Sequence, residues 1–138
     1  MPGPDPSHWL HRLTAPEWLA AAEAELAHAA QALDRRAIRP AITHARRAAG
    51  MAWNAVLVAA PDDRFGRSYM DHVGALVEDS ASPDQVRDAA RTLRETPPVA
   101  PALIKLGRPD AGPLDAARTI LDHARARVAA GPGAPSPG

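Results

Sequence analysis

The chain has 138 residues, enough for one domain with a single core, and its formal net charge is zero. A zero net charge argues against a protein that binds nucleic acid through bulk positive charge. The absence of cysteine excludes disulfides, thiol nucleophiles and cysteine-bound zinc. Apolar residues make up 46% of the chain and aromatic residues only 4%, because alanine supplies much of the apolar content. This composition favours closely packed helices and gives little support for strands.

The N-terminal segment, residues 1–13, is rich in proline and is expected to be flexible. It lacks the basic start and apolar core of a signal peptide. No apolar run in the chain approaches the roughly 20 residues of a membrane-spanning helix. We therefore expect a cytoplasmic protein with no membrane partner.

The first helix is expected from Thr14 to about Arg36. Thr14 and Glu17 have the spacing of a capping box, in which each side chain accepts a hydrogen bond from the backbone of the other residue. Apolar residues recur at intervals of three and four, which predicts one buried stripe. Its members are Leu19, Ala22, Leu26, Ala29 and Leu33.

The second helix is expected to begin just before Pro40, which suits a first turn, and to end at Pro61. Gly50 lies in its middle, where glycine costs about 1 kcal/mol relative to alanine, so we expect a neighbouring helix to approach closely there. The predicted buried stripe consists of Ile42, Ala45, Ala49, Ala52, Val56 and Ala60, widened by Trp53 and Leu57.

Two shorter helices are expected next. The third should run from about Gly66 to Asp79, and the fourth should begin with Ser82 as N-cap and end before Pro97. Gln85 would complete a capping box with Ser82. The predicted inner residues are Tyr69, Met70, Val73, Leu76 and Val77 in the third helix, and Val86, Ala89, Ala90 and Leu93 in the fourth.

An irregular connector follows, with an apolar patch that is expected to lie across the bundle as a lid. The last helix should begin near Leu114, and residues 131–138 should form a disordered tail. Residues 14–130 are therefore predicted to form an all-α antiparallel bundle of about five helices. The connector patch is Leu103, Ile104 and Leu106, and the last buried stripe is Leu114, Ala117, Leu121, Ala124 and Val128.

Metal ligands are not expected. Glu25 and His28 form a Glu-x-x-His pair, but a di-iron bundle needs two such pairs and two further carboxylates. There is no second pair, and residues 40–60 contain no acidic side chain. We therefore predict neither a metal nor another cofactor. The remaining histidines outside the third helix are expected to be surface residues rather than ligands: His8, His11, His44 and His123.

A basic patch surrounds the first helix–helix turn. Arg35 and Arg36 complement the dipole at the end of the first helix. Arg39, Arg46 and Arg47 remain available to hold phosphate, which makes Arg46 and Arg47 candidate substrate-binding residues. The alternative interpretation is that these three side chains only keep an alanine-rich helix soluble.

Arg67 and His72 form the sharpest chemical pattern in the chain. A histidine that titrates near neutral pH can move the proton of a 2′-hydroxyl, and an arginine can hold the scissile phosphate. On one continuous helix the two side chains would point roughly 140° apart, so they can share a pocket only if the helix starts between them or a second subunit contributes. The alternative is that Arg67 is a surface residue and His72 flanks the core.

The arrangement of helices resembles the HEPN superfamily of small all-α domains. The first two helices, "WLAAAEAELAHAAQALDRRAIRPAITHARRAAGMAWNAVLVAA", are similar to the family's opening hairpin, and "LDAARTILDHARARV" is similar to its closing helix. The resemblance covers about residues 15–130. It implies a homodimer with metal-independent ribonuclease activity, in which Arg67 holds phosphate and His72 is the general acid and base. Ser68 would be the polar residue beside Arg67.

The resulting functional hypothesis is a small HEPN-like protein that self-associates and contacts RNA or nucleotide. Metal-independent ribonuclease activity would belong to Arg67 and His72. The alternative is a catalytically inactive helical adaptor that docks a protein partner through its alanine-rich faces. Zero net charge favours the adaptor, and salt-sensitive binding of RNA would count against it.

Overall fold

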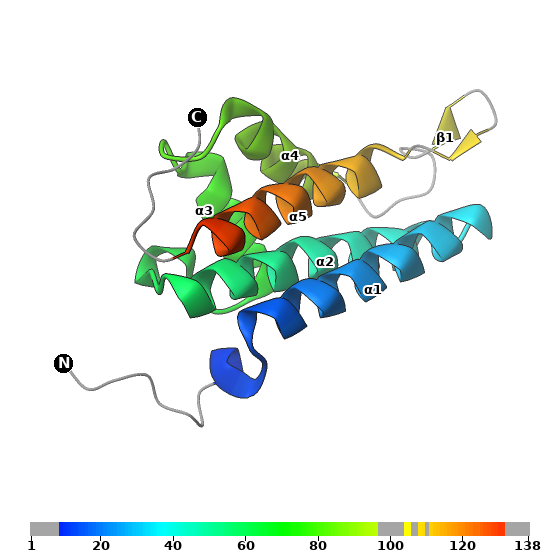
Figure 1. Ribbon diagram of the computed structural model, residues 1–138. Coiled ribbons are helices and arrows are strands. Elements are labelled where there is room, and N and C mark those ends of the chain that lie inside the picture. The colour runs from blue at the N-terminus through cyan, green and yellow to red at the C-terminus, as the bar shows by residue number, and fades with distance from the viewer. Residues whose placement is uncertain (1–8, 97–103, 106–107, 110, 132–138) are drawn as a thin grey trace.

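The computed structural model describes residues 9–96, 104–105, 108–109 and 111–131 of the chain. Five α-helices account for most of these residues (Figure 1). Their bounds are α1 Ala15–Asp34, α2 Ile38–Ala59, α3 Tyr69–Glu78, α4 Asp84–Glu95 and α5 Gly112–Ala130. The prediction of an all-α antiparallel bundle of about five helices is confirmed for the described residues.

Helix α2 is the centre of the bundle, because it contacts each of the other four helices. Helices α1 and α2 form a long antiparallel hairpin, and α5 lies along α2 (Figure 1). The face of α2 that meets its neighbours is built largely of alanine, and small side chains let helix axes approach closely. The fully buried alanines of α2 include Ala45, Ala48, Ala52 and Ala55.

The α1 stripe predicted from the sequence is buried in the core, and Thr14 and Glu17 form the expected capping box. The Glu17 backbone N–H donates to Thr14 Oγ1 at 3.3 Å, and the Thr14 N–H donates to Glu17 Oε1 at 2.9 Å. Arg36 has a φ of 60°, in the left-handed region, and this turns the chain from α1 into α2. Pro40 lies in the first turn of α2, and the helix ends just before Pro61, as expected.

The close approach expected at Gly50 is present. A Cβ atom at this position would overlap the Cβ and ring atoms of Tyr69, the first residue of α3. Tyr69 is half-buried and packs against the core. Glycine at position 50 therefore lets the start of α3 cross α2.

Helix α3 begins later than predicted. Ser68, not Gly66, is next to the helix start, and it forms a capping box with Asp71. The prediction that Met70 faces inward is wrong, because Met70 is 38% exposed. The inward positions of this short helix are His72, Val73, Leu76 and Val77.

The predicted N-cap of α4 is also wrong. Helix α4 begins at Asp84 with Pro83 at the N-cap position, and no side chain caps it. The Ser82 hydroxyl instead donates to Asp79 Oδ2 at 2.7 Å, which closes the turn between α3 and α4. A side chain used in this turn cannot also cap the next helix.

Residues 9–13 are the described part of the N-terminal segment, and the expected flexibility of residues 1–8 lies outside the described residues. Trp9–Arg12 form a 3₁₀ helix, and Leu10 is buried in the core. The Leu10 carbonyl accepts a 2.8 Å hydrogen bond from Trp18 Nε1, which fixes this segment to α1.

Part of the connector before α5 forms a two-residue antiparallel ladder between β1 (Ile104–Lys105) and β2 (Arg108–Pro109). The composition gives little support for strands, so this short ladder was not predicted. Leu103, Leu106 and the tail residues 132–138 lie outside the described residues. Among the helices in the described ranges, none combines the length and apolar character needed to cross a membrane.

Candidate metal-binding site

The predicted pair of Arg67 and His72 is not assembled as a pocket. The helix does start between the two residues, as a shared pocket would require, but His72 is fully buried. His72 Nδ1 lies 2.6 Å from the Phe65 carbonyl oxygen, and its Nε2 lies 2.7 Å from Asn54 Oδ1. Burial lowers the pKa of His72, although the Phe65 carbonyl and Asp71 oppose this shift. Burial therefore disfavours the charged form of the His72 ring, which holds the start of α3 against α2.

Arg67 and Ser68 lie at the exposed start of α3. The Ser68 hydroxyl accepts from the Asp71 backbone N–H at 2.9 Å, and Asp71 Oδ2 accepts from the backbone N–H groups of Ser68 and Arg67. Ser68 therefore has a capping role. The imidazole that was predicted to act with Arg67 is buried in the described chain, so it cannot reach a substrate held by Arg67. The dimer that was expected to join two such sites stays a prediction.

The two candidate substrate-binding arginines have different surroundings. Arg46 donates to the backbone carbonyls of Leu93 and Thr96, at 2.9 Å and 2.7 Å, and so ties α2 to the C-terminal end of α4. The Arg47 side chain is 46% exposed, and its Nη2 lies 3.3 Å from Glu25 Oε1. Only Arg47 is therefore placed to meet a ligand.

Glu25, which pairs with Arg47, belongs to a cluster that joins α1 to α2. Glu25 and His28 are one turn apart on α1, and His44 faces them from α2. Each offers one ligand atom, and these atoms all lie within 4.8 Å of one another. The hairpin explains the meeting, because His28 and His44 lie equally far along the chain from the turn residue Arg36. Glu25 and Arg47 are also equally far from it.

The contacts within the cluster are close. His44 Nδ1 donates to Glu25 Oε2 at 2.6 Å, and the rings of His28 and His44 meet edge to face with their centroids 5.4 Å apart. The Glu25 side chain is 12% exposed and that of His44 29%, whereas His28 is an exposed residue. Glu25 and His44 are therefore the partly buried members of the cluster, and its His28 side is open to solvent.

Tyr69 lies near one end of the cluster. Burial raises the pKa of its hydroxyl, the positive charge of Arg47 lowers it and the negative charge of Glu25 raises it further. Its ring is fixed by the contact with Gly50. The start of α3 therefore brings a phenol group into the electrostatic field of the Glu25–Arg47 pair.

Two imidazoles and one carboxylate are a donor set for divalent transition metals, including zinc and iron. Metal–ligand bonds of about 2 Å place the ligand atoms around one ion roughly 3–4 Å apart. The spacing in the cluster is close to this range. The His44–Glu25 contact would widen to admit an ion, and the exposed His28 side chain can move toward it. Three protein ligands leave further coordination positions open.

This cluster was not predicted from the sequence. Glu25 and His28 were interpreted only as part of a dinuclear centre, which the number of acidic residues does not support. His44 was expected to be a surface residue, whereas it is half-buried and bonded to Glu25. The signal that could have found the site is the pairing across the hairpin, which brings His28 opposite His44.

His123 was also expected at the surface, but it is half-buried in α5. Its ring stacks on Trp53 with the centroids 6.0 Å apart and the planes 12° apart. Burial lowers its pKa, the nearby Arg127 lowers it further, and Asp79 opposes both. His123 is therefore a packing residue against the central helix.

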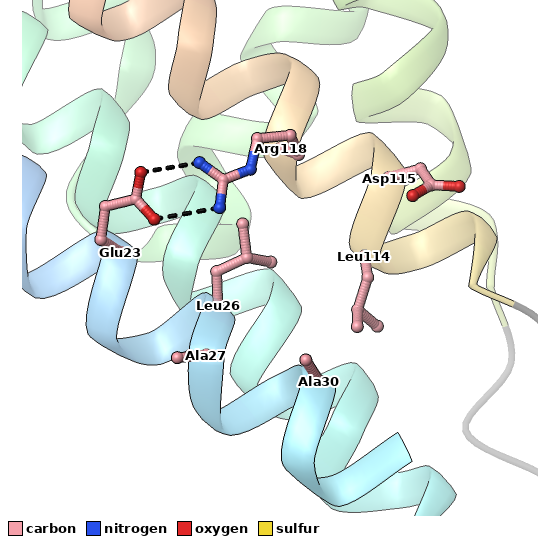
Figure 2. Close-up of a pocket in the computed structure, with 7 residues that line it drawn as sticks. All are labelled: Glu23, Leu26, Ala27, Ala30, Leu114, Asp115 and Arg118. Atoms are coloured by element: carbon pink, nitrogen blue, oxygen red, sulfur yellow. Dashed lines mark hydrogen bonds and ion pairs between the residues drawn. The ribbon is translucent and has the colours of Figure 1, made fainter. Parts of the chain in front are cut away.

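A separate pocket of about 260 Å³ lies between α1 and α5 (Figure 2). Arg118 donates to both carboxylate oxygens of Glu23 at 2.7 Å and 3.0 Å, and Arg125 donates to Glu23 Oε1 at 2.9 Å. These two arginines hold the pKa of Glu23 down to about 2, with Arg118 contributing more. Glu23 and Arg118 line one end of the pocket, and its other walls are largely apolar: Leu26, Ala27, Ala30 and Leu114, with Asp115 also in the lining.

Comparisons with protein-family models, with curated proteins and with solved structures found no match to this chain. The resemblance to the HEPN superfamily therefore stays a prediction.

Proposed function

We propose that this protein binds one divalent transition-metal ion between α1 and α2, through Glu25, His28 and His44. The observation that carries the proposal is the convergence of three potential ligand atoms within 4.8 Å of one another. The three residues come from two helices that the alanine-rich core holds together, so the folded chain keeps two imidazoles and a carboxylate close before any ion arrives. Such preorganisation favours binding, because less conformational entropy is lost.

The proposed site would leave its metal ion accessible to solvent, unlike a structural site in which protein ligands surround the ion. Structural zinc sites have four protein ligands, whereas this cluster supplies three and is open on the His28 side. An ion held this way keeps positions for water or for a ligand from solution. It would act as a Lewis acid toward such a ligand.

RNA or nucleotide would then contact the bound metal ion and not His72. We assign no proton transfer to His72, because its ring is buried and both nitrogens face protein atoms. A phosphate-bearing ligand would instead meet the open side of the metal site, beside Arg47. The alternative hypothesis of a helical adaptor requires no metal ion. A measurement of metal binding therefore distinguishes the adaptor hypothesis from the proposed function.

Isothermal titration of the purified, tag-free chain with Zn²⁺ or Co²⁺ tests the proposal. We expect one ion per chain. Glu25→Gln, His28→Ala and His44→Ala should each weaken binding by about tenfold or more, because each removes a direct ligand. Glu78→Gln is a matched control, since that carboxylate is 80% exposed on α3, and it should keep wild-type affinity.

A second control addresses the N-terminal histidines. His11→Ala should leave the affinity unchanged, because His11 is outside the proposed ligand set. Circular dichroism should show that all variants remain helical. Metal affinity that survives in both His28→Ala and His44→Ala, or that disappears in His11→Ala, would contradict the proposed site.

A further inference from the structure

The Glu25–Arg47 pair places a guanidinium directly beside the proposed metal ligands. Glu25 is the most buried of the ligands, with a side chain 12% exposed, and both of its oxygens are engaged. Oε2 accepts from His44 Nδ1, and Oε1 lies 3.3 Å from Arg47 Nη2. Arg47 is therefore held at the edge of the site while nearly half of its side chain remains in solvent.

Metal binding would change the charge balance of this cluster. In the metal-free chain the charge of Arg47 is offset by that of Glu25. A divalent ion adds two positive charges while the protein ligands contribute only the one negative charge of Glu25. The loaded cluster, with Arg47, then carries a net charge of about +2 in a partly desolvated position, where electrostatic attraction to an anion is strong.

We propose that the metal-loaded site takes a small oxyanion, a phosphate or a carboxylate, which bridges the metal ion and the Arg47 guanidinium. This inference rests on the proposed metal binding and names the ligand class of the same site. One oxygen of the anion would fill an open coordination position. Another would accept hydrogen bonds from Arg47, whose planar group fits the spacing of oxyanion oxygens. The Tyr69 hydroxyl lies close enough to Arg47 and Glu25 to be affected by both charges.

The experiment uses the Co²⁺-loaded full chain, whose visible absorption changes when a new ligand reaches the ion. Sodium phosphate, adenosine 5′-monophosphate and sodium acetate are added in separate titrations at constant ionic strength, with sodium chloride as the reference salt. We expect saturable spectral changes with oxyanions and none with chloride. Saturation at lower concentration by the two phosphates would assign the phosphate class, and the reverse order would assign carboxylates.

Arg47→Gln tests the bridging role. Its oxyanion affinity should fall by about tenfold or more, because a charge-assisted hydrogen bond is lost. Its Co²⁺ affinity should rise, because a positive charge leaves the site and Glu25 loses a competing partner. Arg39→Gln makes the same change in net charge at an exposed position two turns away on α2, and it should behave like the wild type.

The outcomes separate this inference from the proposed function. A wild-type chain that binds no Co²⁺ defeats the metal site before any anion is added. A chain that binds Co²⁺, but whose spectrum no oxyanion changes, leaves the metal site standing and overturns the inference. Equal oxyanion affinity in Arg47→Gln and the wild type would also overturn it.

Discussion

At the residue scale, the contact between His72 and Asn54 explains how a histidine can be buried without charge. A neutral imidazole carries one proton, and the Phe65 carbonyl can only accept, so that proton lies on Nδ1. Nε2 then needs a donor. The contact places Asn54 Oδ1, an acceptor, at Nε2, so we infer that the oxygen and nitrogen of this amide are exchanged. Asn54 Nδ2, otherwise buried without a partner, then donates to Nε2.

This arrangement predicts a pH dependence of stability. The pKa of His72 in the folded chain lies below the ordinary value of 6.5, so the unfolded chain binds more protons in mildly acidic solution. The free energy of unfolding should therefore fall as the pH falls through 6.5 toward the folded-state pKa, and His123 should add to this loss. Urea unfolding at intervals from pH 7.5 to 5 measures it.

His72→Gln is the informative variant, because glutamine can donate and accept but does not titrate in this range. It should lower the free energy of unfolding at pH 7.5 by about 1–3 kcal/mol, through poorer hydrogen-bond geometry. Its stability should depend less on pH than that of the wild type. Equal slopes in the two proteins would show that His72 does not remain neutral in the core.

The role of individual residues was the hardest part to predict. Residue type singled out His72 as a candidate acid–base group, whereas its burial matches the alternative that it flanks the core. The sequence suggested that α3 starts at Gly66, whereas the Ser68–Asp71 capping box sets the start at Tyr69. His44 was missed for a different reason. Its role depends on a partner in another helix, which the local sequence around it does not contain.

At the element scale, the crossing of α2 and α3 depends on Gly50 but not on Gly74. Gly50 lies where a Cβ atom would overlap Tyr69, whereas Gly74 in α3 has nothing within 4 Å of its hypothetical Cβ. Alanine has a higher helix propensity than glycine at both positions. A difference in stability between the two alanine variants therefore reports on packing.

Gly74→Ala should raise the free energy of unfolding by about 0.5–1 kcal/mol, which is the ordinary helix-propensity gain. Gly50→Ala should lower it by about 1–3 kcal/mol, because the overlap involves the Cβ of Tyr69 and cannot be relieved by rotating a flexible end. Thermal or urea unfolding of both variants measures the difference. A stabilising Gly50→Ala would show that α3 does not cross α2 this closely.

The helices themselves were largely predictable because their apolar spacing and their end signals agree. Thr14 and Glu17 fixed the start of α1, and Pro61 fixed the end of α2. The failures occurred where a polar side chain had two competing uses. Ser82 could have capped α4 but instead bonds to Asp79, and the spacing of residues alone does not distinguish these outcomes.

At the scale of the whole molecule, a zero net charge and an alanine-rich core leave few features that can recognise a ligand. The packed hairpin of α1 and α2 brings charged and imidazole side chains together at Glu25, His28, His44 and Arg47, where we propose the metal site. The Glu23–Arg118–Arg125 network on the other side of α1 joins this hairpin to α5. The bundle thus places α1 between this ion-pair network and the proposed metal site.

The most direct test of this account is the anomalous scattering of crystals of the full chain grown with Zn²⁺. The account predicts one anomalous peak per chain at the Glu25–His28–His44 cluster, about 2 Å from a Glu25 oxygen and from one nitrogen each of His28 and His44. An ion bound elsewhere, with the His44–Glu25 hydrogen bond still intact at 2.6 Å, would contradict it.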